Sequence, residues 1–335
     1  MASSIIDVAK RSGVAISTVS KYMSGGNVKP ELSSRIKKAI EELNYSPNPI
    51  AQGLKKSKTF IFGILVPNAT DIFCGGLATR LSVILEQRGY GLLQCDYNSD
   101  RDLFRRKAEF LESKKIDGVF VFPEGLMIDD FAAFRRRNIP IVAIDSLIDG
   151  LTQDMITSDN YGAGYECGEY LIKHGHKNAA VLCSMKGVRT SEYRCNGFLD
   201  AFKKSGYEIG SDNILYDCEN GDTDIIGFIK QLKEKETSVT AVFSVNYHIS
   251  IKTVFNLLYD GIRIGSDISF ISVDNIFSDK KQQDIITCAM QDIDTLAETA
   301  AELMFARMTG AEIGKAKHRN IAMILNEGKT VYDML

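Results

Sequence analysis

The first 45 residues carry apolar side chains at helical spacing. Ile5, Val8 and Ala9 recur at i, i+3 and i+4, which places them on one face of a helix. Gly13 follows as a residue that tolerates a tight turn, and a second apolar face begins at Val19. The pattern predicts two short helices joined at a glycine turn, as in a helix-turn-helix motif.

A third helix is predicted to begin at Pro30, which suits the first helical turn because its missing N–H is not needed there. Its apolar positions share one face and would close a three-helix core over the first two helices. This apolar stripe consists of Leu32, Ile36, Ala39, Ile40 and Leu43.

Beyond residue 58 the pattern changes to short apolar runs that alternate with amphipathic stretches. This alternation predicts βαβ units and parallel sheets, and the 277 residues suffice for two lobes with their own cores. Ligands of such sheets bind outside the carboxyl ends of the strands. The predicted strands lie within residues 60–67, 90–98, 117–123, 139–145, 179–185, 240–246 and 268–274.

Charge divides the chain in the same place as the apolar pattern does. Residues 1–58 contain ten Lys or Arg and four Asp or Glu, whereas the rest of the chain contains 30 and 39. A basic arm on an acidic protein indicates a polyanionic partner, here DNA, although a solvated helical hairpin would share the pattern. The outward positions expected to meet bases and phosphates are Ile16, Ser17, Thr18, Ser20 and Lys21.

Several longer segments carry a family resemblance. AKRSGVAISTVSKYM, IEELNYSPNPIAQGLKK and FGILVPN, followed by SDNYGAGYECGEYLIKHGHKNAAVL and YRCNGFLDAFKKSGY, resemble the lac repressor family (LacI/GalR) of bacterial transcription regulators. The resemblance covers essentially the whole chain. It implies an all-α helix-turn-helix headpiece with a hinge helix, and an α/β core of two doubly wound parallel-sheet lobes like those of periplasmic binding proteins.

The resemblance also implies a division of the chain. The headpiece is expected at residues 1–47 and the hinge helix with its linker at 48–58. The effector-binding and dimerisation core is expected at 59–335. We expect its chain crossings near Thr157, Cys288 and Ile321, which give an N-lobe of about 59–157 and 289–321 and a C-lobe of about 158–288 and 322–335.

In this family the hinge folds on DNA and lies in the minor groove. The positions implied to contact DNA here are Asn48, Ala51, Leu54 and Lys55, with Leu54 as the apolar wedge that opens a base step and kinks the duplex. Gly53 disfavours helix by about 1 kcal/mol relative to Ala. Ile16 departs from the usual base-reading residues, since it can pack on a thymine methyl but cannot hydrogen-bond a base edge.

Candidate ligand residues come from the strand ends and from the resemblance. Asp145, Asn246 and Asp274 each end a predicted strand, and each taken singly could equally be a capping or turn residue. Carboxylates, an amide and an arginine around an aromatic ring suit a polyhydroxylated ligand. Tyr247 stands where the family usually has aspartate, which leaves a purine or another small effector open. The resemblance adds Phe73, Arg194 and Gln291 to the effector site.

Other motifs predict no catalysis, cofactor or metal. The glycines of TSDNYGAGYECG are spaced GxGxxxG without an acidic residue to hold a ribose, so we interpret Asp159 or Asn160 as a helix cap. His174 and His176 lack further metal ligands. The seven cysteines are scattered and are expected to be reduced. No Ser/His/Asp arrangement appears at a recognisable spacing.

The expected function is a sequence-specific DNA-binding transcriptional regulator, a repressor of carbohydrate-utilisation genes controlled by a sugar between the lobes. Its partners would be a pseudo-palindromic double-stranded operator and a second copy of the chain, because no heptad-rich tail follows residue 335. Without a signal-type or membrane-spanning apolar run, we expect a cytoplasmic, nucleoid-associated bacterial protein. The alternatives are a purine or phosphorylated carrier protein as effector, a stand-alone sugar-binding protein, and an enzyme of nucleotide or sugar metabolism.

Overall fold

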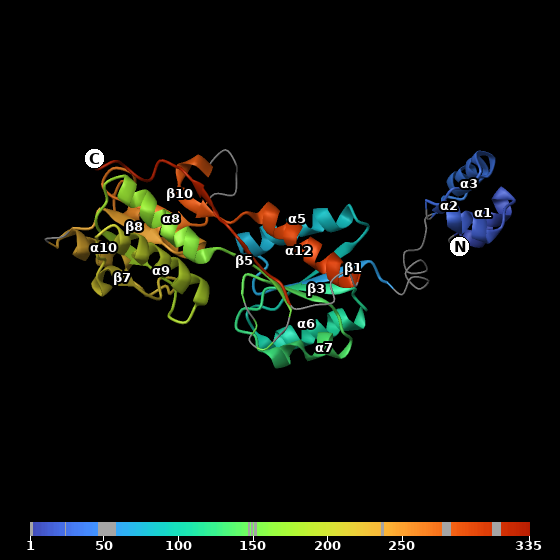
Figure 1. Cartoon of the computed structure of the whole chain (residues 1–335), viewed down its shortest axis with the longest axis horizontal. Helices are drawn as coiled ribbons and strands as arrows, with labels where there is room; N and C mark the ends of the chain where they lie inside the picture. Colours follow the sequence, from blue (N-terminus) through green and yellow to red (C-terminus); the bar gives the residue numbers. More distant parts are fainter. Residues whose placement is uncertain are drawn as a thin grey trace.

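A computed structural model of the chain shows a small helical headpiece and a two-lobed α/β core (Figure 1). The predicted fold class, an all-α headpiece before two lobes built on parallel sheets, is confirmed. The predicted hinge helix lies outside the described residues. The structure describes residues 3–23, 25–45, 58–146, 148, 150, 153–235, 238–276, 283–309 and 316–335.

Three helices form the headpiece: α1 (Ile5–Ser12), α2 (Ile16–Met23) and α3 (Pro30–Glu42). Proline stands at the start of α3 as the sequence predicts. The apolar stripes of the three helices meet in one small core. Its buried members are Val8, Ala9, Val19, Ile36 and Ala39.

Local capping fixes the ends of the first two helices. Ser4 and Asp7 form a capping box, in which each side chain accepts a hydrogen bond from the other residue's backbone N–H, at 3.3 Å and 2.9 Å. Gly13 ends α1 in the left-handed region at φ +65°. α2 starts after Ala15, which has no side chain able to cap it, and the Ala15 carbonyl accepts from the N–H groups of Thr18 and Val19.

The N-lobe sheet has the strand order β11-β5-β4-β3-β1-β2, and every neighbouring pair is parallel. Its central strands read as nearly continuous apolar runs because helices cover both faces. Figure 1 shows α5 (Ile72–Glu86) and α12 (Ile293–Met308) on one face, with α6 (Arg101–Ser113) and α7 (Ala132–Arg136) on the other. The strands are β1 Ile61–Val66, β2 Gly91–Asp96, β3 Gly118–Val121, β4 Ile141–Ile144, β5 Asp154–Ser158 and β11 His318–Ile321.

The C-lobe sheet repeats this design in the order β12-β10-β9-β8-β6-β7. Its one departure from parallel pairing among the described residues is β12 against β10. The strands are β6 Ala179–Leu182, β7 Ile214–Leu215, β8 Ala241–Ser244, β9 Ser269–Val273, β10 Thr287–Met290 and β12 Ile324–Asn326. The helices are α8 Asn160–Lys173, α9 Arg189–Lys204, α10 Ile225–Lys233 and α11 Tyr247–Tyr259. Short 3-10 turns complete the lobes: η1 Ile128–Phe131, η2 Ser211–Asn213 and η3 Gln283–Ile285.

The chain passes between the lobes three times. β5 belongs to the N-lobe sheet and α8 packs in the C-lobe, so the first passage follows Ser158. The second follows β10, before α12 returns to the N-lobe core, and the third separates β11 from β12. Three passages side by side allow the lobes to move relative to each other about the passages.

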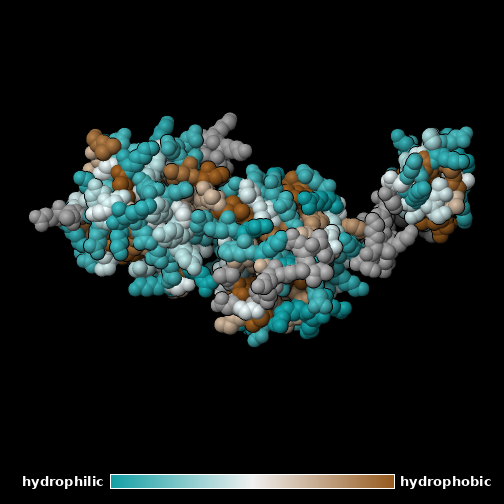
Figure 2. Space-filling view, in the orientation of Figure 1, coloured by the Kyte–Doolittle hydropathy of each residue, from teal (hydrophilic) through white to brown (hydrophobic). Residues whose placement is uncertain are grey.

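In both sheets the strand order changes direction at the first strand of the lobe. β1 lies between β2 and β3, and β6 lies between β7 and β8, which are the switch points of a doubly wound sheet. Polar residues that follow these strands are therefore placed at the crevice where such folds bind ligands. On the face drawn in Figure 2 the surface of both lobes is mostly hydrophilic, with hydrophobic residues in small patches.

Candidate functional site

Two aspartates occupy equivalent positions in the two lobes. Asp145 follows β4 at φ +72°, and Asp274 follows β9 at φ +66°. Each donates its backbone N–H to the neighbouring strand, to Ile156 O and Ala289 O respectively, both at 2.8 Å. Aspartate tolerates this left-handed conformation better than most residues, and such conformations gather at functional sites. The two turns place a carboxylate at the carboxyl end of each sheet.

The C-lobe aspartate faces a buried arginine. Arg194 lies in the second turn of α9, and only 5% of it is exposed. Its Nε donates to Asn160 Oδ1 at 2.7 Å and its Nη1 to the Val245 carbonyl at 2.8 Å. Nη1 also lies 3.6 Å from Asp274 Oδ2. Because a guanidinium carries more N–H donors than these contacts use, Arg194 can still donate to a ligand.

Gln291 ties Asp274 to the passage between the lobes. Its Nε2 donates to Asp274 Oδ1 at 3.0 Å, and its Oε1 accepts from Ser158 Oγ at 2.8 Å. Burial raises the pKa of Asp274, while the charge of Arg194 and the hydrogen bond from Gln291 act in the opposite direction. Two passages of the chain therefore meet through one amide beside the C-lobe carboxylate.

Two glycines set the position of Arg194. α8 and α9 approach so closely that a Cβ on Gly164 would lie 1.9 Å from the Arg194 carbonyl oxygen, and one on Gly197 would lie 2.1 Å from the Tyr161 carbonyl oxygen. The glycine-rich segment therefore serves helix packing, which the sequence did not reveal. The predicted cap is confirmed, since Asp159 Oδ1 accepts the first-turn backbone N–H of α8 at 3.1 Å.

Asn246 organises the C-lobe side at the switch point. It caps α11 by accepting the Ile249 N–H at 3.0 Å, and its Nδ2 donates to Ser184 Oγ at 3.1 Å and Glu219 Oε1 at 2.5 Å. Tyr247 follows as the first residue of α11. The capping role weighed from sequence is thus present, and the same side chain holds polar groups at the strand ends.

The N-lobe aspartate has no such partners. Asp145 Oδ1 is buried and accepts no hydrogen bond from the residues that the structure describes. Burial raises the Asp145 pKa to about 6, the charges of Asp274, Glu124 and Asp71 add to the rise, and Arg194 opposes it. A buried carboxylate oxygen without a donor is rare in folded proteins, and at a cleft it marks a place for a ligand.

An aromatic ring and a second carboxylate lie on the same lobe. Phe73, the second residue of α5, is half-buried and meets Phe122 edge to face, with ring centroids 5.6 Å apart. Glu124 lies two residues after Phe122, in the loop after β3. Burial raises the pKa of Glu124, and the charges of Glu219 in the C-lobe and Asp71 in the N-lobe raise it further. Glu124 therefore faces carboxylates from both lobes.

One ion pair joins the lobes. Asp71, the N-cap of α5, lies with its Oδ2 3.4 Å from Nε2 of His248 in α11. The hydrogen bond with Asp71 raises the pKa of His248 against the opposing effect of burial. The pKa of Asp71 is lowered, because its hydrogen bonds from His248 and Cys74 outweigh its burial. This ion pair therefore connects the N-lobe helix α5 to the C-lobe helix α11.

The six residues predicted to bind an effector line the facing ends of the two sheets, but their contact with a ligand stays a prediction. Other polar residues at these strand ends were not predicted from the sequence. Applying the strand-end rule to β1, β3, β6 and β8 would have pointed to most of them, since they follow these strands. The missed residues are Asp71, Glu124, Ser158, Asn160, Ser184, Glu219 and His248.

The headpiece exposes part of its predicted DNA-binding surface. Ile16 is 48% exposed, Ser17 and Lys21 are exposed, and Thr18 and Ser20 are partly buried. The four predicted hinge contacts, at positions 48, 51, 54 and 55, lie outside the described residues. A reading role for either set stays a prediction.

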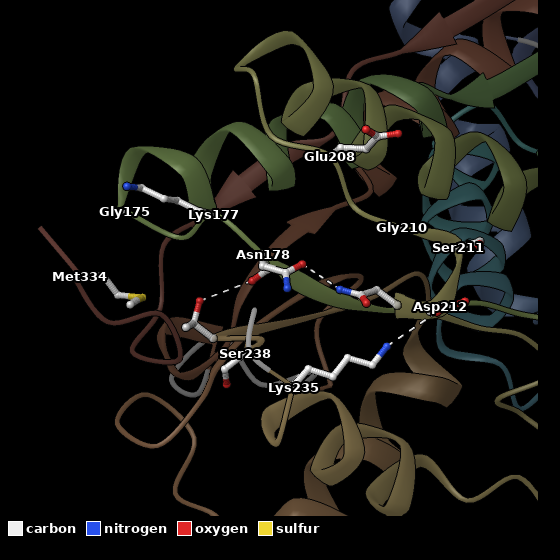
Figure 3. Close-up of a pocket in the computed structure, with 12 residues that line it drawn as sticks. Gly175, Lys177, Asn178, Glu208, Gly210, Ser211, Asp212, Lys235, Ser238 and Met334 are labelled. Carbon is white, nitrogen blue, oxygen red and sulfur yellow. Dashed lines mark hydrogen bonds and ion pairs between the residues drawn. The ribbon is translucent and has the colours of Figure 1, made fainter.

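Surface cavities occur elsewhere. One of about 750 Å³ lies at the amino-terminal ends of the C-lobe strands (Figure 3). Polar groups that line it contact one another. Asn213 Nδ2 donates to Asn178 Oδ1 at 2.7 Å, and Lys235 Nζ lies 3.9 Å from Asp212 Oδ2. A second, of about 700 Å³, lies beside Pro140 in the N-lobe. Neither is at the carboxyl ends, so we place the candidate site between the lobes.

Other chemistry is not apparent in the described part of the chain. No group of three or more histidine, cysteine or acidic residues could hold a metal ion there. His176 is buried and bonds to Thr240 Oγ1 at 2.8 Å and to the Tyr332 carbonyl at 3.1 Å. All seven cysteines are buried and free. Among the described helices, none has the length and apolar character to span a bilayer.

A helix-turn-helix headpiece on a two-lobed core, with polar strand ends facing each other, defines the class of ligand-controlled DNA-binding regulators. Residues 4–48 match the family described as bacterial regulatory proteins, lacI family. Residues 59–318 match the periplasmic binding proteins and sugar binding domain of LacI family. The chain belongs to the LacI family of bacterial regulatory proteins.

Individual relatives agree with this assignment. The HTH-type transcriptional repressor PurR of Pasteurella multocida (strain Pm70) is 27% identical over 315 residues, covering 91% of both proteins. The structure of the lac repressor dimer bound to operator and the anti-inducer ONPF aligns with a TM-score of 0.79 at 19% identity, covering 99% of this chain and 100% of that one. The CelR–cellobiose complex aligns with a TM-score of 0.68 at 20% identity, covering 98% and 99%. The curated relatives compared are transcriptional repressors, a non-enzymatic class.

Proposed function

We propose that this protein represses carbohydrate-utilisation genes by binding a pseudo-palindromic operator, and that a small sugar bound between the lobes controls this binding. The observation that carries the proposal is the meeting of polar side chains from the carboxyl ends of both sheets on a chain that also bears a helix-turn-helix headpiece. Arg194 and Asp274 on one lobe and Asp145 on the other are its centre.

The chemistry of these side chains suits a hydroxylated ring. Arg194 and Asn246 donate hydrogen bonds, Asp145 and Asp274 accept them, and the ring of Phe73 offers an apolar face. The family description names a sugar binding domain, and the CelR relative is a cellobiose complex. A purine stays the second candidate, because the curated relatives are repressors named PurR.

The headpiece would place α2 in the major groove. Ser17, Ser20 and Lys21 would donate to bases and phosphates, while Ile16 and Thr18 would pack against them. We keep Asn48, Ala51, Leu54 and Lys55 as proposed minor-groove contacts, with Leu54 as the wedge. This division of labour assumes the headpiece, hinge and core boundaries given above. The DNA-binding role places the protein in the bacterial cytoplasm with the nucleoid.

A second copy of the chain is the proposed partner of α11. Its outer face exposes three large apolar side chains, Phe255 at 65%, Leu258 at 57% and Tyr259 at 96%. Such a cluster on one helix is typical of a protein interface. A homodimer would bring two headpieces to the two halves of an operator, as the lac repressor dimer is bound to its operator in the aligned structure.

Movement of the lobes would couple ligand binding to operator binding. A ligand that contacts both lobes binds the closed arrangement better, so it shifts the population towards closure. Closure would move the two N-lobes of the dimer and change the spacing of the hinges that connect them to DNA. The factor by which the ligand changes operator affinity equals the factor by which the operator changes ligand affinity, and it cannot exceed the ratio of the ligand affinities of the two arrangements.

A selection of operator sequences tests the regulator directly. The full chain is incubated with random duplexes, the bound DNA is sequenced, and the enriched site is measured by gel shift. We expect an enriched inverted repeat, with saturable binding that weakens as salt rises. Leu54→Ala should lower the affinity and the bend angle without changing the fold, and Phe110→Ala, which truncates an exposed apolar side chain of α6 in the core, serves as a control. Binding without sequence preference would instead favour a stand-alone sugar-binding protein.

A further inference from the structure

A loop of the C-lobe carries a carboxylate to the switch point of the sheet. Residues 216–224 connect β7 to α10, and Glu219 lies in this loop. Its Oε1 accepts hydrogen bonds from Ser184 Oγ at 2.9 Å and from Asn246 Nδ2 at 2.5 Å. Ser184 follows β6 and Asn246 follows β8, so three neighbouring strands each contribute one polar side chain to this cluster. The cluster therefore lies at the crevice where a doubly wound sheet binds ligands.

The same cluster lies at the boundary between the lobes. Asn246 is the N-cap of α11, and His248 in the first turn of that helix has its Nε2 3.4 Å from Oδ2 of Asp71 in the N-lobe. The Asn246 amide donates to both Ser184 and Glu219, while its Oδ1 accepts the hydrogen bond that caps the helix. A ligand that contacts Asn246 from the cleft therefore meets the Glu219 carboxylate as well.

Lys252 of α11 holds the backbone on both sides of Glu219. Its Nζ donates to the carbonyl of Cys218 at 3.1 Å, to that of Asn220, and to that of Thr223 at 3.4 Å. Cys218 and Asn220 are the residues directly before and after Glu219. An ammonium group has three N–H donors, so these three carbonyls use all of them. The lysine therefore binds the loop rather than an acidic side chain.

The loop is fixed before a ligand arrives. Besides the contacts with Lys252, the Cys218 N–H donates to the Cys183 carbonyl at 3.1 Å, and Thr223 Oγ1 donates to the Asp217 carbonyl at 2.7 Å. No described residue donates to Oε2 of Glu219, whose Oε1 is held by the cluster. A preorganised acceptor lowers the entropy cost of binding, and a carboxylate accepts stronger hydrogen bonds than a neutral oxygen does. This acceptor suits a ligand that offers a hydroxyl group.

We propose that Glu219 determines the specificity of the effector site by accepting a hydrogen bond from one hydroxyl group of an uncharged sugar, and that Lys252 is the positioning residue that holds Glu219 in place. This inference rests on the proposed function, because it takes the cleft as the effector site. It deepens that function by assigning one hydroxyl of the ligand to one carboxylate, and the geometry of that carboxylate to a lysine of α11.

Matched ligands and variants test the specificity. Calorimetric titration of the full chain at about pH 7 finds the tightest binder among D-ribose, D-xylose, D-glucose, D-galactose and cellobiose, and then compares it with its monodeoxy analogues. We expect one deoxy analogue to bind wild type about tenfold more weakly than its parent sugar, and Glu219→Gln about twofold more weakly or less. Glu208→Gln, an exposed residue at the amino-terminal ends of the C-lobe strands, is the control that should keep the tenfold difference.

A double-mutant cycle tests the positioning role. Lys252→Met should weaken binding of the parent sugar about tenfold in wild type, but about twofold or less in the Glu219→Gln background. Lys252→Arg keeps a cation with N–H donors and should recover part of the affinity. Hydrogen exchange at the amides of residues 217–223 should quicken in Lys252→Met. It should keep the wild-type rate in Lys230→Met, the control, whose ammonium group lies 2.8 Å from Asp260 Oδ2.

The outcomes separate this proposal from the function on which it rests. An equal loss from every deoxy analogue in wild type and in Glu219→Gln overturns the specificity role, while a parent sugar that alters operator binding upholds the sugar-controlled repressor. Additive losses in the cycle overturn the positioning role of Lys252. No binding by any sugar of the panel overturns an uncharged sugar as the ligand of Glu219, and operator selection still decides on DNA binding.

Discussion

The two lobes share one strand order yet hold their strand-end aspartates in different ways. Asp274 in the C-lobe is paired with Arg194 and accepts a hydrogen bond from Gln291. Asp145 in the N-lobe has the same left-handed backbone but a buried oxygen without a donor. The C-lobe half of the site is therefore built before a ligand arrives, whereas the N-lobe half is left for the ligand to complete.

This difference gives each lobe a distinct role. A preformed C-lobe half lowers the entropy cost of the first contacts with a ligand. Unsatisfied N-lobe groups gain only when a ligand bridges both lobes, so they reward closure. The account predicts that variants of the two halves have effects of different size and even opposite sign.

Removing the C-lobe cation should have the largest effect. Arg194→Ala removes the cation paired with Asp274 and the donor to Asn160 Oδ1, and breaking a buried pair costs about 3–5 kcal/mol of unfolding free energy. Ligand-induced stabilisation, measured as the rise in Tm, should vanish. Arg194→Lys keeps the charge without the planar guanidinium and should recover part of the stability. An unchanged denaturation midpoint in Arg194→Ala would show that the C-lobe half is not held as described.

Displacing the same arginine through the backbone should have the next largest effect. Gly164→Ala puts a Cβ against the Arg194 carbonyl, so α8 and α9 must separate at a cost of about 1–3 kcal/mol. Ligand affinity should fall with the denaturation midpoint. Gly210→Ala has open space around its Cβ and is the matched control. Equal midpoints for the two variants would contradict the close contact.

The two aspartates should respond to a different degree to loss of charge. At about pH 7 Asp145→Asn removes a charge whose buried oxygen has no donor and should raise the unfolding free energy by about 1–2 kcal/mol, whereas Asp274→Asn should raise it less, because Arg194 and Gln291 offset the burial of that carboxylate. Because the folded-state pKa of Asp145 is raised from 3.8 to about 6, wild-type stability should increase as the pH falls from about 7 to about 4. Arg194, Asp274, Glu124 and Asp71 face this carboxyl. Urea denaturation across that range should show the increase in wild type and a smaller one in Asp145→Asn.

The ion pair between the lobes should have the smallest effect. His248 is about half exposed, and an exposed pair contributes about 0–1 kcal/mol. Since the pKa of His248 is raised and that of Asp71 lowered, the pair exists between these two values and is lost as the pH rises through the His248 pKa. His248→Gln should make the ligand-free radius of gyration, measured by X-ray scattering, larger and less dependent on pH between about 6 and 8. A wild-type radius without any pH dependence would show that the pair does not favour closure.

Much of the fold was predictable because it depends on local pattern. Apolar spacing located α1 and α2, Pro30 marked the start of α3, and apolar runs located the central strands. Apolar spacing did not locate the start of α9, which begins at Arg189 and so places Arg194 in its second turn. Helix starts depend on capping and on tertiary contacts, which apolar spacing does not record.

The site was predictable only in part, for a physical reason. Strand-end position and family resemblance pointed to Asp145, Asp274 and Arg194, but they carry no information on which groups stay unpaired. Whether a polar group is paired depends on contacts between segments distant in the sequence, such as Gln291 with Ser158 and Asp71 with His248. The role of the glycines in α8 likewise appears only when α9 is packed against them.

The central claim is that a ligand held between the lobes controls DNA binding. The most direct test is the operator affinity of the full chain with and without the tightest ligand from a panel of sugars and nucleobases, in wild type and in Arg194→Ala. We predict that the ligand changes wild-type affinity by about tenfold or more, while the variant binds the same operator and does not respond. An equal ligand response in the two proteins, or none in wild type, would contradict the account.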